Sequence, residues 1–212
     1  MKKFFFTSFM CATLTCGTLL APIPSRGETS RIGPGLFVSG IPRDQLEYFA
    51  APQVQGRQRQ SNWCWAAAVQ MVLNYHGLYV TQEQVVAKIF GELINKPGAP
   101  ENILGALSGW APDTRGRFSN IYASALPLRG SDLVHDLNRR WPLIVGLKQP
   151  GNVGHAYVLT GVTYKVGRNG QLIFRSVILR DPWPRSQSRI EMGWADFESR
   201  LTFAARVRVD RL

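Results

Sequence analysis

The stretch "RQRQSNWCWAAAVQ", residues 57–70, places one cysteine, Cys64, between two tryptophans and directly before an alanine-rich run. Alanine has the highest helix propensity, and serine or asparagine is a typical N-cap. The stretch therefore predicts a helix over about residues 63–76, capped by Ser61 or Asn62. The Cys64 thiol is expected in the first turn, where unpaired backbone N–H groups and the helix dipole favour an anion.

The first residues have the layout of a secretory signal peptide. Two lysines precede an uncharged, largely apolar stretch from Phe4 to about Pro22, and a small polar run follows. Ser25 and Gly27 are small residues that suit cleavage after Gly27. We expect residues 1–27 to be removed on export to the periplasm or the exterior, without stable membrane insertion afterwards. An uncleaved membrane anchor is the alternative, although the stretch is marginal for spanning roughly 30 Å of hydrocarbon.

Cleavage would also decide the cysteine count and the charge. It removes Cys11 and Cys16, so the mature chain keeps only Cys64 and forms no internal disulfide, which favours a bacterial exported protein over a disulfide-stapled secreted domain. The formal charge of +11 falls to +8, because the leader holds three cations and no acid. The basic residues are scattered and match no nucleic-acid module, so we expect no nucleic-acid partner. An anionic envelope or an acidic substrate fits this charge.

The remaining chain is expected to form a single domain, residues 55–212, after an irregular N-terminal segment, residues 28–54. Helix signals come first: a capping-box pattern at Thr81 and Gln84, and helices predicted over residues 100–110 and, capped by Ser131, over 132–140. Strand signals follow over residues 142–147, 155–166 and 171–180, with a turn at 167–170, a helix at 194–200 and a final strand near 202–209. Helices followed by antiparallel strands indicate an α+β fold.

A reactive thiol needs a base, and the chain contains three histidines. His76, near the end of the first helix, and His135, in an arginine-rich helix, are expected to be packing or surface residues. His155 opens a strand after the turn "PGNVG", so its ring is expected at the end of a sheet, where a helix terminus can face it. A buried cysteine with only a packing role is the alternative for Cys64.

The base in turn needs an acceptor that orients it. Folding the hairpin brings Asp181 opposite the neighbourhood of Val158, within a few residues of His155. An irregularity of one or two residues in the pairing would close the gap, and Asp181 would then stabilise the charged imidazole. The alternative for Asp181 is an ordinary turn before Pro182.

Acyl transfer also needs donors for a developing oxyanion. Gln58, six residues before Cys64, is the candidate beside the Cys64 backbone N–H, and Gln60 is the competing choice. A metal site is disfavoured, since one cysteine and three widely separated histidines lack the short paired spacing of zinc sites. We expect neither a metal nor a cofactor.

Three motifs, "QRQSNWCWAA", "GHAYVLTGV" and "LRDPWP", occur in this order and resemble the bacterial papain-like cysteine peptidases. That branch includes plant-pathogen effector proteases and relatives of the bacteriocin-leader peptidases. The resemblance covers residues 55–200 and implies a papain-like fold, in which an N-terminal helical half carries the nucleophile and packs on a C-terminal antiparallel sheet. Two departures from papain itself are the missing cysteine before the nucleophile and an aspartate in place of asparagine as the third residue.

The resemblance also implies site roles and a function. The matching residues are the nucleophile Cys64, the base His155, its orienter Asp181, the oxyanion donor Gln58, and the supporting Trp183 and Trp65. The implied protein is an exported monomeric protease that hydrolyses proteins or peptides through a thioester acyl-enzyme. A cell-wall amidase, an acyl or amine transferase with the same triad, and a binding module on a retired enzyme scaffold stay open.

Overall fold

The computed structural model describes residues 28–49, 57–110, 119–125, 127–152 and 154–211, so the predicted leader lies outside the described residues. The helices are α1 (Cys64–Tyr75), α2 (Gln82–Phe90), α3 (Pro100–Leu107), α4 (Gly130–Asn138) and α5 (Trp194–Arg200), with the short 3-10 helices η1 (Arg43–Phe49) and η2 (Pro150–Asn152). The strands are β1 (Glu28–Gly33), β2 (Leu36–Gly40), β3 (Ser119–Ala125), β4 (Leu143–Lys148), β5 (Gly154–Val166), β6 (Leu172–Arg180), β7 (Arg189–Gly193) and β8 (Leu201–Arg211).

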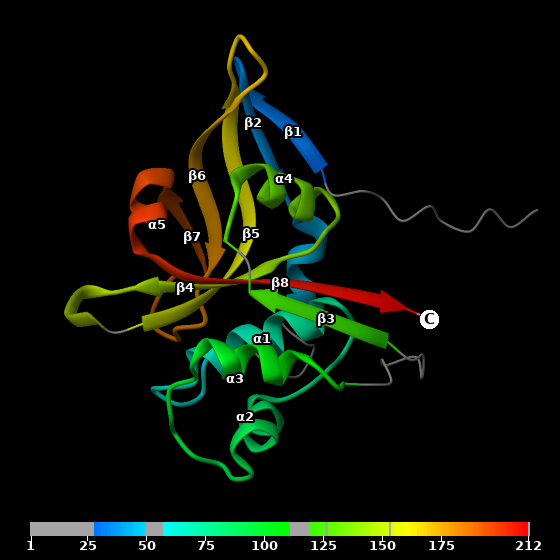
Figure 1. Cartoon of the computed structure of the whole chain (residues 1–212), viewed down its shortest axis with the longest axis vertical. Coiled ribbons are helices and arrows are strands. Elements are labelled where there is room, and N and C mark those ends of the chain that lie inside the picture. Colours follow the sequence, from blue (N-terminus) through cyan, green and yellow to red (C-terminus); the bar gives the residue numbers. More distant parts are fainter. Residues whose placement is uncertain (1–27, 50–56, 111–118, 126, 153, 212) are drawn as a thin grey trace, which may run out of the picture.

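The described strands form one antiparallel sheet around the long strand β5 (Figure 1). One edge of β5 pairs first with β4 and then with β2, while β6 runs along the other edge. Strands β8 and β3 continue the sheet beyond β4, and β7 continues it beyond β6. Because β4 and β2 share one edge of β5, the sheet divides at this strand and curls instead of staying flat.

Strand β5 carries two hydrophobic cores, since successive side chains of a strand point to opposite faces. Ala156 and Val158 pack in a core with residues of α1, α2 and α3. Tyr157 and Leu159 pack in a second core with residues of α4 and α5. In Figure 1 the helices α1, α2 and α3 accordingly gather at one end of the molecule, and α4 and α5 lie elsewhere along the sheet. The predicted α+β architecture is confirmed.

Helix α1 is buried on all sides, with every residue from 65 to 74 buried. Its small alanines let the sheet and the neighbouring helices approach closely, as a central helix requires. The expected cap is wrong: Trp63 is the N-cap, without a side-chain cap hydrogen bond. Ser61 and Asn62 instead bond to Asn95, whose side chain accepts from the Asn62 backbone N–H and donates to Ser61 Oγ.

Of the other predictions of local structure, some are confirmed and some are wrong. The capping box of Thr81 and Gln84 is confirmed, whereas α4 begins after Arg129 and not after Ser131. The expectation that residues 28–54 are irregular is wrong for residues 28–40, which form β1 and β2. Strand β2 pairs with β5, which lies far away in the sequence, and β1 pairs with β2. The strands β3 and β7 were likewise not predicted.

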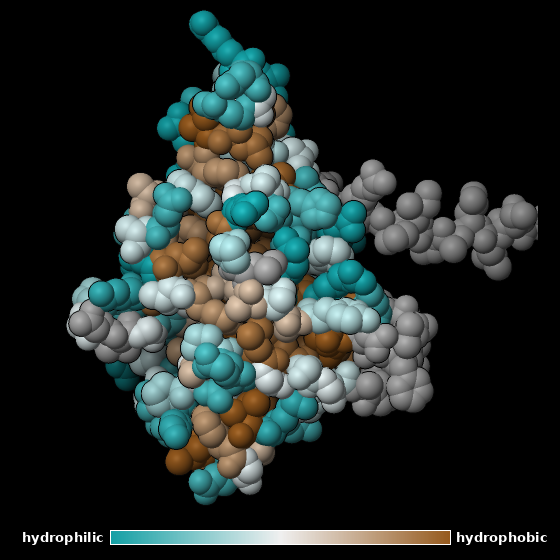
Figure 2. Space-filling view, viewed as in Figure 1, coloured by the Kyte–Doolittle hydropathy of each residue, from teal (hydrophilic) through white to brown (hydrophobic). Residues whose placement is uncertain are grey.

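The surface differs between the two ends of the molecule. Figure 2 shows a polar tip above a hydrophobic area at the end where the β5–β6 hairpin lies. The strand register brings the exposed Ile32, Val166 and Ile173 to this end. The hairpin tip lies at the opposite end of the molecule from α1, α2 and α3 (Figure 1). In the part of the chain that the structure describes, no helix has the length and hydropathy needed to cross a membrane.

Candidate active site

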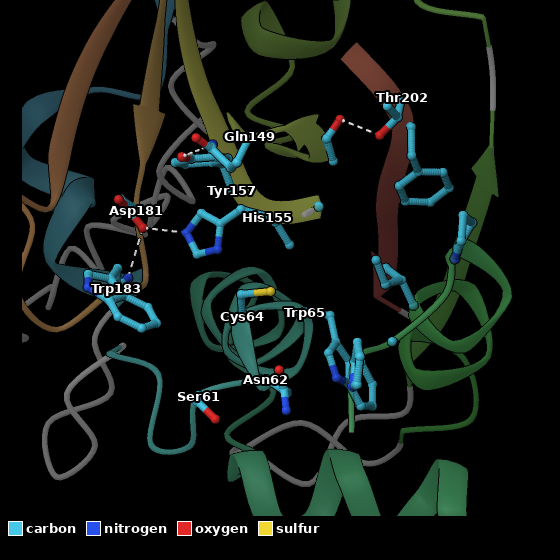
Figure 3. A pocket seen from close by; sticks show the side chains of 18 residues that line it. Ser61, Asn62, Cys64, Trp65, Gln149, His155, Tyr157, Asp181, Trp183 and Thr202 are labelled. Atoms are coloured by element: carbon cyan, nitrogen blue, oxygen red, sulfur yellow. Dashed lines mark hydrogen bonds and ion pairs between the residues drawn. The ribbon is translucent and has the colours of Figure 1, made fainter. Parts of the chain in front are cut away.

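The structure brings Cys64, His155 and Asp181 together in one cleft (Figure 3). Cys64 is the first residue of α1, His155 lies at the start of β5, and Asp181 directly follows β6. All three line a cavity of about 730 Å³. The His155 ring lies between the Cys64 thiol and the Asp181 carboxylate, which is the order that a nucleophile, a base and an orienting group require (Figure 3).

Strand pairing places Asp181 beside His155. Val158 pairs with Arg180, so Asp181 emerges in the neighbourhood that the sequence predicts. The register shifts between Leu159 and Gly161 and again after Thr163, so the pairing does contain irregularities. His155 Nε2 lies 2.8 Å from Asp181 Oδ1.

Three hydrogen bonds hold the buried Asp181 carboxylate. Besides the bond from His155, Oδ1 accepts from the Trp183 backbone N–H at 2.8 Å, and Oδ2 accepts from Ser186 Oγ at 2.7 Å. Burial alone would raise the pKa of Asp181, but these bonds and the His155 charge hold it below its ordinary value. The carboxylate is therefore ionised. Ser186 could not be predicted from the sequence, since a serine in a proline-containing turn is common and carries no specific signal.

The thiol and the imidazole shift each other's pKa. Burial on its own would raise the pKa of Cys64, but the hydrogen bond to His155, the backbone N–H of Ala156 and the His155 charge hold this pKa below its ordinary value. Burial would lower the pKa of His155, but its bonds to Asp181 and Cys64 and their charges raise it from 6.5 to about 9. Between these two pKa values the pair exists as thiolate and imidazolium.

The tryptophans on either side of the cysteine fix one wall of the cleft. Trp63 Nε1 donates to the carbonyl of Ile94 at 2.9 Å, and Trp65 Nε1 donates to that of Lys96 at 3.1 Å. Gly98 lies against the Trp65 ring so closely that a Cβ there would be 2.4 Å from Trp65 Cδ2. Both indoles thus hold segment 94–98 beside the cleft, and Trp65 also lines the cavity.

Aromatic rings surround the His155 imidazole. The Trp183 ring lies edge-on with its centroid 6.4 Å away, and the Tyr157 ring lies edge-on at 4.6 Å. Gln149 donates to the Tyr157 hydroxyl at 2.8 Å and accepts from Arg200 at 2.8 Å. Trp183 was anticipated from the sequence. Tyr157 was missed, although its position two residues after His155 puts it on the same face of the strand.

Gln58 is not among the residues that line the cavity. Its side-chain amide donates to the carbonyls of Gln60 and Ser61, both at 2.8 Å, which uses both amide hydrogens. Its amide oxygen is buried without a hydrogen-bond partner within the described residues. Gln60 is exposed in the same loop. The oxyanion role of Gln58 therefore stays a prediction.

The two other histidines lie outside the cleft. His76 caps the C-terminal end of α1, and His135 is exposed on α4. Among the described residues, no group of three or more histidine, cysteine, aspartate or glutamate side chains lies together as metal ligands would.

A thiol at the N-terminus of a buried helix, facing an imidazole on a curled antiparallel sheet, defines a papain-like cysteine peptidase fold and site. The chain belongs to this class: residues 46–202 match the family of the papain-like cysteine protease AvrRpt2. The protein is therefore a cysteine-type peptidase, and the resemblance inferred from its three motifs is confirmed.

Two solved structures are similar in fold. The peptidase domain of Streptococcus ComA, a bi-functional ABC transporter involved in a quorum sensing pathway, is 17% identical, with a TM-score of 0.49 over 74% of this chain and 96% of that one. A double glycine motif protease from an AMS/PCAT transporter, solved with the leader peptide, is 19% identical, with a TM-score of 0.47 over 71% of this chain and 87% of that one. A comparison with curated proteins found no significant match.

Proposed function

We propose that this chain is an exported monomeric peptidase that hydrolyses peptide bonds in proteins or peptides through Cys64, His155 and Asp181. The observation that carries the proposal is the imidazole held between the thiol and an ionised carboxylate, with His155 Nε2 2.8 Å from Asp181 Oδ1. Because His155 Nε2 is hydrogen-bonded to Asp181, Nδ1 is the ring nitrogen that exchanges a proton with Cys64. No step requires a metal or a cofactor.

The first half of the reaction forms an acyl-enzyme. The Cys64 thiolate attacks the carbonyl carbon of the scissile amide, and the carbonyl oxygen becomes an oxyanion. His155 Nδ1 then gives its proton to the leaving nitrogen, the C–N bond breaks, and a thioester remains on Cys64. Asp181 stabilises the imidazolium until that transfer.

The second half returns the enzyme to its starting state. Neutral His155 takes a proton from water, and the resulting hydroxide attacks the thioester carbonyl. The C–S bond breaks, the new carboxylic product leaves, and the thiolate and imidazolium form again.

Oxyanion stabilisation is assigned to the N-terminus of α1. The Cys64 backbone N–H lies in the first turn, where no carbonyl of the same helix can accept from it. Gln58 is the proposed second donor, provided that substrate binding turns one amide hydrogen away from the Ser61 carbonyl. Loss of one such donor typically costs about 2.7–4 kcal/mol of transition-state stabilisation, so Gln58→Ala would lower kcat about 100-fold or more.

Cleavage of a diverse peptide mixture, followed by mass spectrometry, tests the proposed activity. The protein is expected to generate new peptide termini, whereas Cys64→Ala yields none. Equal cleavage by Cys64→Ala would contradict the proposal. Release of muropeptide fragments, or transfer of the acyl group to an added amine without hydrolysis, would instead assign the triad to a cell-wall amidase or a transferase.

Export is proposed from the leader layout of residues 1–27. Fusing these residues to a reporter that becomes active only outside the bacterial cytoplasm tests it. We expect an active reporter and, in the full protein, a mature N-terminus at Glu28. A reporter that stays inactive, with an intact leader on the recovered protein, would refute export.

A further inference from the structure

Arg180, the last residue of β6, is a half-buried cation. Its Nε is buried without a hydrogen-bond partner, and within the described residues Arg180 forms no ion pair. It directly precedes Asp181, so it lies at the edge of the candidate active site. A buried guanidinium nitrogen without a hydrogen-bond partner costs free energy, which makes the position unusual for a purely structural residue.

The charged neighbours of Arg180 that affect it are also cations. Strand pairing sets Arg180 directly opposite Arg189 on β7, and like charges opposite each other destabilise a sheet. Arg57 approaches from the loop before α1 and donates to the carbonyls of Asp181 and Trp183, at 3.2 and 2.8 Å. Together with burial, the charges of Arg189 and Arg57 lower the pKa of Arg180. We call Arg57, Arg180 and Arg189 the arginine cluster.

The neighbouring acids do not pair with Arg180, since the Asp181 carboxylate is held by His155, the Trp183 backbone N–H and Ser186, and Glu191 pairs with Arg189. Glu191 lies 3.4 Å from Arg189, and both side chains are about half exposed. Glu191 also accepts a hydrogen bond from Ser176. An exposed pair of this kind contributes little and leaves Arg180 unpaired. A methionine or leucine would fill the same volume at the end of β6 without the cost of an unpaired charge.

The cluster lies where an extended substrate would reach it. Arg57 contacts the backbone carbonyl of Trp183, and the Trp183 side chain lines the cleft on the Asp181 side of Cys64. Trp65 lines the cleft on the other side of Cys64 (Figure 3). The three arginines are not among the residues that line the cavity, so only the part of a peptide that extends past Trp183 would reach them.

We propose that the arginine cluster binds an oxyanion, a carboxylate or a phosphate, and that the bound group is normally an acidic side chain of the peptide substrate. Guanidinium groups bind such planar or tetrahedral oxyanions through paired hydrogen bonds, and the bound anion neutralises the repulsion between Arg180 and Arg189. This inference deepens the proposed function and rests on it. A free anion carries the same chemistry and is distinguished by the test.

The first arm compares peptides that differ only by glutamate or glutamine, placed in turn at each of four positions on either side of the scissile bond. At one position we expect the wild type to prefer glutamate about tenfold in kcat/KM. The preference for glutamate is expected to vanish in Arg180→Met. It is expected to weaken in Arg189→Met, because the Arg189 side chain is about half exposed. Arg175→Met, which removes an exposed arginine earlier on β6, is the matched control and keeps it.

The second arm titrates inorganic phosphate and measures thermal unfolding. Phosphate is expected to raise the Tm of the wild type and of Arg175→Met, but not that of Arg180→Met. A phosphate effect without a glutamate preference would identify a free anion as the occupant. The absence of both effects in the wild type, or their persistence in an Arg180→Met variant that unfolds cooperatively, would overturn the inference.

The two arms also separate this inference from the proposed function. If the wild type cuts none of the peptides, the proposed function fails, and the phosphate titration still tests the cluster. If the wild type cuts glutamate and glutamine peptides equally well and phosphate has no effect on its Tm, the inference alone fails.

Discussion

On the helical side of the cleft Cys64 is placed by its own helix, whereas on the sheet side His155 and Asp181 depend on pairing between distant parts of the chain. The position of Cys64 follows from one buried helix and its first turn. The contact of Asp181 with His155 requires the register of β5 with β6 and a turn closed by Ser186. The sequence near Cys64 thus determines the position of the proposed nucleophile, whereas its proposed activation by His155 and Asp181 depends on tertiary structure.

The largest effect is expected from removing His155, the proposed base on the sheet side. His155→Ala should lower kcat/KM by about 10²–10⁴-fold, the usual contribution of general acid–base catalysis, because the His155 imidazole holds down the pKa of Cys64. His135→Ala is the matched control, since His135 is exposed on α4, outside the cleft. Steady-state kinetics on one peptide compares the two. Equal losses in both variants would contradict the assignment of His155.

Changing the charge of the orienting residue should have a smaller effect with a distinctive pH dependence. In Asp181→Asn the amide oxygen still accepts from His155, but the negative charge that helps to raise the pKa of His155 to about 9 is gone. Activity that needs the imidazolium is lost as pH rises through that pKa. The alkaline limb of the kcat/KM profile should therefore move to lower pH, with a loss of about ten- to a hundredfold.

Asp181→Ala, which also removes the acceptor, is expected to lose more activity than Asp181→Asn. An alkaline limb that stays in place in both variants would show that Asp181 does not set the protonation of His155.

The helical half can be predicted from sequence to within a few residues, because its signals are local. The alanine run and the box of Thr81 and Gln84 act over one or two helical turns, and the structure agrees with them. The β5–β6 hairpin and the place of Asp181 follow from a turn and the period of two. The strands β1 and β2 were not predictable in this way, since β2 pairs with the distant strand β5. The hydrogen bonds of the Gln58 side chain go to the nearby carbonyls of Gln60 and Ser61, in a loop without a periodic pattern from which they could be predicted.

A substitution at Gly98, in the wall of the cleft, tests whether close packing against Trp65 shapes the helical side of the cleft. In Gly98→Ala the new Cβ would collide with the Trp65 ring, which is buried and cannot move freely. We expect a loss of about 1–3 kcal/mol in the free energy of unfolding and a raised KM, because segment 94–98 must shift. The control is Gly193→Ala, where a Cβ meets nothing within 4 Å. Equal stability of both variants in urea unfolding would refute this contact.

The smallest effect is expected at Ser186, which acts on His155 only through Asp181. Removing its hydrogen bond in Ser186→Ala leaves the carboxylate two other donors, so kcat/KM should fall less than tenfold. The alkaline limb should shift slightly to lower pH, and Ser186→Thr should restore both values. A loss of stability in Ser186→Ala without any shift of its kcat/KM profile with pH would show that Ser186 only stabilises the turn.

The pH dependence of Cys64 alkylation tests the activated thiol most directly. The full protein is treated with iodoacetamide from pH 4 to 10, and the rate at Cys64 is followed by mass spectrometry of its peptide, in the wild type and in His155→Ala. We expect the wild type to titrate well below the ordinary thiol pKa of about 8.5, and the variant to titrate at or above it. Coincident curves near 8.5 for both proteins would contradict the thiolate–imidazolium pair.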